Sequence, residues 1–206
     1  MRVHIFISLI LMFLFLKIVF GLTISGQENI PRKGGVIIAP NHRSNWDPPV
    51  IAVSIALKRE VFFLAKEELF WVNKFYALLL KKYNAFPIRK SGIDKKTIRV
   101  ASFLLQKGKT IIVFPEGKRN LGNGFLSPQP GVGYLAIKNK VPIIPVYMSG
   151  TTEKMINLLF RKKRVKVIFG KKIDTANFVS NHSLLKDSKK VTDFVMNRIR
   201  SLKTNA

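Results

Sequence analysis

The stretch VIIAPNHRSNWDP, residues 36–48, contains the pattern that decides the fold of this 206-residue chain. It begins with an uninterrupted apolar run, residues 36–39, of the kind found in strands that are buried on both faces of a sheet. Pro48 disfavours helical geometry in the residue before it and suits the start of a helix, so Asp47 is predicted to be a helix N-cap. A buried strand that is followed closely by a helix indicates an α/β fold.

The rest of the chain repeats this alternation. Four further apolar runs are predicted strands: residues 61–65, 110–114, 143–147 and 165–169. Four stretches are predicted helices: residues 47–57, 66–82, 93–107 and 184–203. Ser91 is a plausible cap for the third of these helices and Gly108 a plausible stop. Strands that alternate with helices of this length predict an α/β domain with a mixed, largely parallel sheet flanked by helices.

The chain begins with a strongly apolar segment, VHIFISLILMFLFLKIVFGL, at residues 3–22. Twenty helical residues cover about 30 Å, which is just enough for the core of a bilayer. Lys17 near one end can extend its ammonium group to the lipid headgroups. A cleaved signal peptide and a buried core helix are the alternatives. We expect residues 1–22 to form a retained membrane anchor that spans the bilayer or enters one leaflet, and residues 23–206 to form a single domain.

Charge is the strongest signal in the composition, because the chain has 36 basic residues and only 11 acidic ones, and its formal net charge is +25. Such an excess attracts polyanions, of which nucleic acid and an anionic membrane surface are the two candidates. Charge alone does not separate them. The apolar start of the chain favours the membrane.

The composition also excludes several classes of protein. With 47% hydrophobic residues the chain can bury a sizeable core, which excludes an intrinsically disordered protein. It contains no cysteine, which excludes a disulfide framework, a thiol nucleophile and a cysteine-ligated metal site.

His42 and Asp47 are the first candidates for catalysis. On a continuous helix, side chains five residues apart diverge by about 140°, so the two can pair only if the chain turns between them. The helix start predicted at Pro48 supplies that turn. A histidine that faces a carboxylate is a general base with an orienting partner, and it can act directly on a hydroxyl of the substrate. The alternative is a histidine with a purely structural role.

Two further segments place cations where strands end. The segment FPEGKRN, residues 114–120, follows a strongly apolar strand, at the edge where α/β sheets bind ligands. Its glycine allows close approach of a ligand to the backbone, and Lys118 and Arg119 offer donors for phosphate. The segment FPIRK, residues 86–90, likewise ends in Arg89 and Lys90. Solvated surface charge is the alternative for each segment taken alone.

Taken together and in this order, the motifs resemble those of the glycerolipid acyltransferase family, specifically the 1-acyl-sn-glycerol-3-phosphate acyltransferases. Asn41, His42 and Asp47 match the histidine–four residues–aspartate motif, and residues 114–119 match the motif Phe-Pro-Glu-Gly-x-Arg. Residues 141–146, VPIIPV, match a later Val-Pro-Ile-x-Pro-Val block. The resemblance extends over residues 31–149.

The resemblance implies a catalytic pair and an acceptor site. His42 would deprotonate the acceptor hydroxyl, and Asp47 would orient the imidazole. The acceptor site would include four consecutive residues of the segment FPEGKRN, with Arg119 on the phosphate: Glu116, Gly117, Lys118 and Arg119.

Other positions are less sharply assigned. The family's arginine of the second motif matches either Arg89 or Lys90, and we favour Arg89 because it is the arginine of the two. Lys118 stands where threonine is commoner in the family, and Asn120 where serine is commoner. These departures leave the fine preference for the acceptor open.

The implied reaction moves a fatty acyl group from acyl carrier protein or acyl-CoA to the sn-2 hydroxyl of 1-acyl-sn-glycerol-3-phosphate (lysophosphatidic acid), giving phosphatidic acid in phospholipid biosynthesis. It requires no metal and no cofactor besides the acyl donor.

The expected partners are the lipid bilayer, lysophosphatidic acid and the acyl thioester, but not nucleic acid. The expected location is the cytoplasmic face of the cell inner membrane. The alternatives are a related acyltransferase with glycerol-3-phosphate or another lysolipid as acceptor, and a non-catalytic basic protein that binds a membrane surface or nucleic acid.

Overall fold

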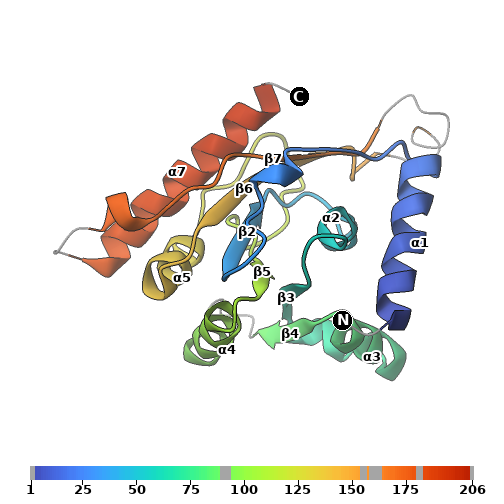
Figure 1. The fold of residues 1–206 in the computed structure, drawn as a ribbon, viewed down its shortest axis with the longest axis horizontal. Helices are drawn as coiled ribbons and strands as arrows, with labels where there is room; N and C mark the ends of the chain where they lie inside the picture. Colours follow the sequence, from blue (N-terminus) through green and yellow to red (C-terminus); the bar gives the residue numbers. More distant parts are fainter. Residues whose placement is uncertain (1–2, 89–93, 154–156, 158–163, 180–182, 205–206) are drawn as a thin grey trace.

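The computed structural model describes residues 3–88, 94–153, 157, 164–179 and 183–204 of the chain (Figure 1). Its strands form one seven-stranded sheet in the order β1-β7-β6-β2-β5-β3-β4. The strands are β1 (Thr23–Ser25), β2 (Val36–Pro40), β3 (Val61–Lys66), β4 (Ala85–Ile88), β5 (Thr110–Ile112), β6 (Ile143–Ser149) and β7 (Lys166–Phe169).

Five neighbouring strands, β6, β2, β5, β3 and β4, run parallel to one another. In the centre of the sheet Ile38 pairs in register with Ile112 of β5 and Ile144 of β6. Strand β7 is antiparallel to β6, and β1 is parallel to β7. The prediction of a mixed, largely parallel sheet is confirmed.

Helices cover both faces of the sheet. They are α1 (Val3–Val19), α2 (Asp47–Ile55), α3 (Lys74–Lys82), α4 (Lys95–Gln106), α5 (Gly131–Asn139) and α7 (Leu184–Thr204), with short 3-10 turns at Gln27–Asn29, Glu67–Phe70 and Ala176–Phe178. Helices α4, α5 and α7 lie on one side of the sheet, and α1 and α2 on the other (Figure 1).

The central strand β2 shows why two cores form. Val36 and Ile38 belong to the apolar cluster under α1 and α2, whereas Ile37 and Ala39 belong to the cluster under α4, α5 and α7. Successive side chains of a strand point to opposite faces of the sheet, so a continuous apolar run fills both layers. This explains the absence of polar alternation in residues 36–39.

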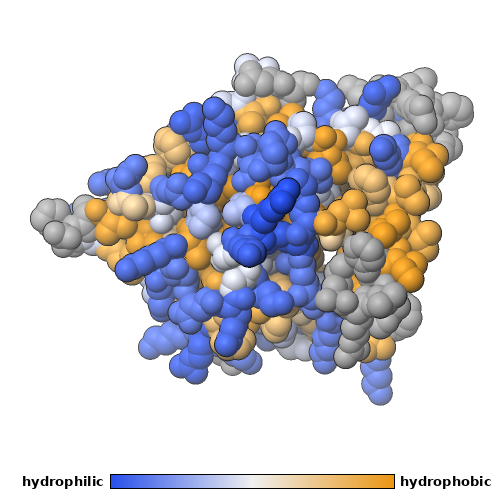
Figure 2. Space-filling view, viewed as in Figure 1, coloured by the Kyte–Doolittle hydropathy of each residue, from blue (hydrophilic) through white to orange (hydrophobic). Residues whose placement is uncertain are grey.

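Helix α1 has two apolar faces with different surroundings. The inner face packs into the cluster shared with α2. Leu16 in the helix is 1% exposed, and Phe20, the residue after the helix end, is 6% exposed. Leu11 and Ile18 on the outer face are 61% and 64% exposed. Figure 2 shows hydrophobic side chains gathered over α1 on the right, and hydrophilic ones across much of the middle. Among the described residues, α1 included, the helices lack the combination of length and apolar character needed to cross a bilayer.

Some boundaries differ from the prediction. The predicted helix over residues 66–82 is divided, because the backbone of Lys66 continues β3 in register with Ile88 of β4, and a 3-10 turn precedes α3. Sheet pairing here outweighs the helical propensity of the sequence. Helix α4 is capped by Asp94, whose side chain accepts from the N–H of Thr97 at 2.7 Å; the predicted cap, Ser91, lies outside the described residues.

Helix α5 was not expected, because Pro130 and two glycines are typical of a loop. Gly133 is required by packing: a Cβ at this position would lie 2.1 Å from the carbonyl oxygen of Ser188 in α7. The glycine therefore marks a close helix–helix approach and not a chain break. Strands β1 and β4 were not among the predicted strands: β1 has two polar residues of three, and β4 contains Pro87.

Candidate active site

The chain turns sharply after β2 and brings His42 onto Asp47. The imidazole Nδ1 lies 2.9 Å from the Oδ2 atom of the carboxylate. The same Oδ2 accepts the backbone N–H groups of Arg43 at 2.6 Å and Ser44 at 2.8 Å. Asp47 is fully buried. The predicted turn and the pairing of these two side chains are both present.

The turn differs in detail from the predicted helix cap. Trp46 occupies the N-cap position, and Asp47 is the first helical residue. The following residues, Pro48 and Pro49, have no N–H to donate, so the carboxylate of Asp47 is directed backwards to the N–H groups that precede it. The prolines therefore leave the carboxylate free to bind the histidine.

Two contacts fix the ring of His42. Its plane stacks on the ring of Phe114, with centroids 3.9 Å apart and an interplanar angle of 21°. Because Asp47 can only accept when ionised, Nδ1 of His42 carries the proton and Nε2 is the basic nitrogen of the neutral ring. Within the described residues Nε2 has no hydrogen-bond partner, and the side chain is 15% exposed. The free nitrogen is suited to accept a proton from a substrate.

Glu116 lies behind the histidine and not on the surface. It is 2% exposed, and its Oε1 accepts the backbone N–H of His42 at 2.9 Å. Its Oε2 accepts the N–H of Leu126 at 2.8 Å. The N–H of Asn120 donates to the carbonyl oxygen of His42 at 2.8 Å. The predicted acceptor residue Glu116 is thus engaged with the backbone on both oxygens.

The next three residues of the segment are exposed. Gly117 turns the chain with a φ of 68°, which favours glycine. The side chains of Lys118 and Arg119 reach solvent, and among the described residues they form no hydrogen bond or ion pair. Arg89 and Lys90, the remaining predicted site residues, lie outside the described residues.

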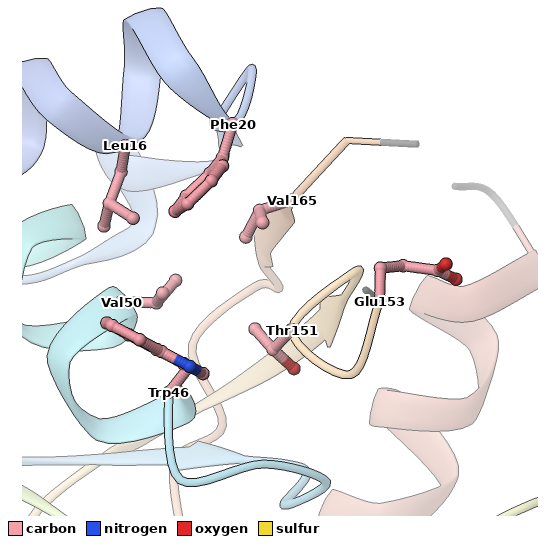
Figure 3. Close-up of a pocket in the computed structure, with 7 residues that line it drawn as sticks. All are labelled: Leu16, Phe20, Trp46, Val50, Thr151, Glu153 and Val165. Carbon is pink, nitrogen blue, oxygen red and sulfur yellow. The ribbon is translucent and has the colours of Figure 1, made fainter. Parts of the chain in front are cut away.

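An apolar groove opens beside the pair. The groove is small and open to solvent, with a volume of about 100 Å³ (Figure 3). Its apolar walls are Leu16, Phe20, Trp46, Val50 and Val165. Thr151 and Glu153 complete the lining, with the carboxylate of Glu153 directed away from the groove. Because Trp46 directly precedes Asp47, the groove lies next to the His–Asp turn.

Comparison with known proteins adds the family. The family model described as Acyltransferase matches residues 21–149. The chain belongs to the acyltransferase family. It is 30% identical over 158 residues to the 1-acyl-sn-glycerol-3-phosphate acyltransferase of Bacillus subtilis (strain 168), a match that covers 77% of this chain and 76% of that protein.

Other relatives have the same description. The probable 1-acyl-sn-glycerol-3-phosphate acyltransferase of Mycoplasma genitalium is 32% identical over 184 residues, covering 82% of this chain and 67% of that protein. The chain spans about half of the human 1-acyl-sn-glycerol-3-phosphate acyltransferase alpha, to which it is 30% identical over 143 residues. The crystal structure of the 1-acyl-sn-glycerophosphate (LPA) acyltransferase from Thermotoga maritima superposes with a TM-score of 0.67 at 26% identity, covering 97% of this chain and 78% of that one.

Sequence reasoning missed two contributions to the site. Phe114 lies inside the recognised segment, but it stacks on His42, which follows a different strand, and no local sequence pattern indicates this contact. The groove beside Trp46 was missed because its other walls come from α1 and from Val165. A tryptophan directly before Asp47 was the available signal.

Proposed function

We propose that this protein transfers a fatty acyl group from an acyl thioester to the sn-2 hydroxyl of 1-acyl-sn-glycerol-3-phosphate, producing phosphatidic acid for phospholipid biosynthesis. The observation that carries the proposal is the 2.9 Å contact between His42 and Asp47 at the carboxyl edge of the sheet, in a member of the acyltransferase family. Relatives from bacteria and mammals named for this reaction support the choice of acceptor.

In the proposed reaction Nε2 of His42 removes the proton of the acceptor hydroxyl while the oxygen attacks the thioester carbonyl carbon. The tetrahedral species collapses by breaking the C–S bond, and the imidazolium returns its proton to the departing thiolate. Asp47 stabilises the imidazolium formed in between. The products are the new ester and a free thiol, so no metal or further cofactor enters the balance.

We assign the acceptor phosphate to the exposed cations Lys118 and Arg119. A guanidinium binds phosphate through two parallel N–H donors, whereas an ammonium acts as a point charge. We expect Arg119→Ala to raise the apparent KM for lysophosphatidic acid by about tenfold or more, with the KM of the acyl donor little changed. Arg119→Lys is expected to recover only part of the loss. Arg89 and Lys90 are proposed as additional phosphate contacts.

We propose that the apolar groove holds part of an acyl chain, because its walls are aromatic and aliphatic and include Trp46, which directly precedes Asp47. The outer face of α1 then meets the lipid leaflet that holds the acceptor, at the cytoplasmic face of the cell inner membrane. The net charge of +25 adds attraction to anionic lipid.

The membrane contact is tested by substitution and not by deletion, because Leu16 and Phe20 belong to the core. Flotation with anionic vesicles is measured for wild type and for the double variant Leu11→Ser, Ile18→Ser. We expect the wild type to stay bound at high salt and the variant to be released, since salt screens charge but not apolar burial. Leu185→Ser on α7, where Leu185 is 65% exposed, is the matched control and should behave as wild type. If the double variant stays bound at high salt, the outer face of α1 is not the membrane contact.

The reaction is tested with purified protein in detergent micelles. Labelled acyl carrier protein thioester and acyl-CoA are each offered with lysophosphatidic acid, glycerol-3-phosphate or lysophosphatidylcholine, and the lipid products are separated. We expect labelled phosphatidic acid from lysophosphatidic acid with at least one donor. Transfer to glycerol-3-phosphate alone, or to none of the acceptors, would reject the proposed function.

A further inference from the structure

The backbone of His42 is held by the segment FPEGKRN, residues 114–120. Strand β2 ends at Pro40, so the N–H and C=O of His42 lie beyond the sheet ladder. The N–H donates to Glu116 Oε1 at 2.9 Å, and the C=O accepts from the N–H of Asn120 at 2.8 Å. Buried backbone groups need such partners, and here both come from one five-residue segment. The position of the base therefore depends on the conformation of residues 116–120.

The carboxylate of Glu116 is committed to this task. Its second oxygen accepts from Leu126 N–H at 2.8 Å, and the side chain is 2% exposed. Bonds from N–H groups to an ionised carboxylate are stronger than those to a neutral acceptor. A buried anion is also poorly suited to contact an anionic phosphate, because the two charges repel. Its geometry fits support of His42 better than contact with the acceptor headgroup.

The ring of His42 is held in a similar way. Phe114 stacks on one face at 3.9 Å, and Asp47 binds Nδ1, so the ring is constrained in two directions. The face of an aromatic ring also attracts a cation, which favours the imidazolium that forms during proton transfer. Leucine at this position would fill much of the same space but provide no aromatic face.

We propose that Phe114 and Glu116 are positioning residues that hold the ring and the backbone of His42, and that only residues 117–119 of this motif meet the acceptor phosphate. The proposal rests on the proposed function. It divides one continuous motif into a buried half that sets turnover and an exposed half that sets acceptor affinity.

The test compares kcat with the apparent KM for lysophosphatidic acid in four variants. Phe114→Leu is expected to lower kcat about threefold to thirtyfold, and Phe114→Tyr to restore most of it, because the stacking face returns. Glu116→Gln is expected to lower kcat roughly tenfold to a hundredfold, since one backbone N–H then meets an amide donor and the base shifts. In all three the KM should change less than about threefold, whereas Arg119→Ala should mainly raise the KM.

Glu60→Gln is the control for the loss of a carboxylate elsewhere, because Glu60 binds Lys109 at 2.9 Å and is distant from His42 in the fold. It should retain wild-type kcat. A rise in KM with unchanged kcat in Glu116→Gln would overturn the positioning role and place Glu116 on the acceptor. Equal kcat for Phe114→Leu and wild type would overturn the role of the ring. Absence of transfer by the wild-type enzyme would instead reject the proposed function, so the two failures are distinguishable.

Discussion

At both edges of the parallel strands, charged side chains bind backbone groups, but the edges differ in the chemistry of the groups that remain unpaired. At the amino edge, the guanidinium of Arg59 donates to the carbonyl oxygens of Pro31 at 2.6 Å, Gly34 at 2.5 Å and Gly108 at 2.6 Å. These carbonyls lie just before β2 and β5, so one side chain fixes the starts of two neighbouring strands.

At the carboxyl edge, Asp47 and Glu116 gather backbone N–H groups in the same manner, yet the network is incomplete. Among the described residues His42 Nε2 has no partner, and the buried Oδ1 of Asp47 has none either. Unpaired polar atoms in a buried network cost stability and are typical of functional sites. In the described part of the chain, the buried hydroxyl of Thr110, at the start of β5, is unpaired at the amino edge as well. The carboxyl edge differs because its unpaired atoms belong to an imidazole and a carboxylate, which can exchange a proton. We infer that the charged network of the amino edge serves stability and that of the carboxyl edge serves chemistry.

The largest expected effect comes from removing charge at the carboxyl edge without changing its shape. Asp47→Asn can place its amide oxygen where Oδ2 accepts three hydrogen bonds, and its NH₂ group where Oδ1 has no partner. We expect kcat to fall about 10²–10⁴-fold, because the imidazolium loses its stabilising charge, while the unfolding temperature changes little. The measurement is steady-state acyl transfer beside thermal unfolding. Asp174→Asn, which removes an exposed ion pair with Lys172, is the control. Near-wild-type turnover in Asp47→Asn would remove the distinction between the edges.

A stability effect is expected from the amino edge. Arg59→Met keeps most of the apolar stem but loses three hydrogen bonds from a charged donor. We expect the free energy of unfolding to fall by about 2–4 kcal/mol, with kcat of the folded enzyme unchanged. Urea unfolding and activity below the transition measure both quantities.

The neighbouring Lys58→Met is the matched control, since Lys58 makes a single exposed bond to the Gln27 carbonyl at 3.2 Å. Its effect should stay below about 1 kcal/mol. A loss of kcat in Arg59→Met without a loss of stability would show that the amino edge also serves the reaction.

The smallest effect concerns the ion pair between Glu60 and Lys109 at the same amino edge. Burial raises the pKa of Glu60, but the hydrogen bond and the charge of Lys109 outweigh it, and the pKa lies below its ordinary value of 4.5. A lowered folded-state pKa stabilises the protein above the ordinary value, and this contribution is lost as the pH falls through the folded-state pKa. Because both side chains are partly exposed, we expect less than about 1 kcal/mol at neutral pH.

The check is the difference in unfolding free energy between wild type and Glu60→Gln, measured from pH 7 downwards at low and high salt. The difference should shrink below the ordinary pKa of glutamate, and salt should reduce it. A difference that grows as the pH falls would contradict the direction of the pKa shift.

The fold was predictable where the signal is local. The runs at residues 36–39 and 61–65 are apolar throughout, and each became a strand of the parallel sheet. Pro48 fixed the start of α2 to within one residue, since Asp47, the predicted N-cap, is the first helical residue. The errors at residues 66–82 and at α5 arise where the structure depends on distant contacts. Pairing with β4 extends β3 to Lys66, and packing against α7 accounts for Gly133 in α5.

The site divides in the same way. The pairing of His42 with Asp47 was predictable because five residues and a proline determine the turn. The engagement of Glu116 with the N–H of His42 was not, because a side-chain bond to a distant backbone leaves no periodic pattern. Helix α1 posed a related difficulty: residues 3–22 are apolar on every side, so the sequence did not reveal that Leu16 faces the core while Leu11 faces outwards.

The central claim is that Nε2 of His42 removes the proton of the acceptor hydroxyl. The most direct test is the rate of phosphatidic acid formation by His42→Ala, in a preparation whose unfolding temperature and vesicle binding match those of the wild type. We predict a loss of about 10²–10⁴-fold in kcat, with the KM for lysophosphatidic acid little changed because the proposed phosphate contacts at residues 117–119 remain. A folded His42→Ala enzyme that turns over at nearly the wild-type rate would contradict the account.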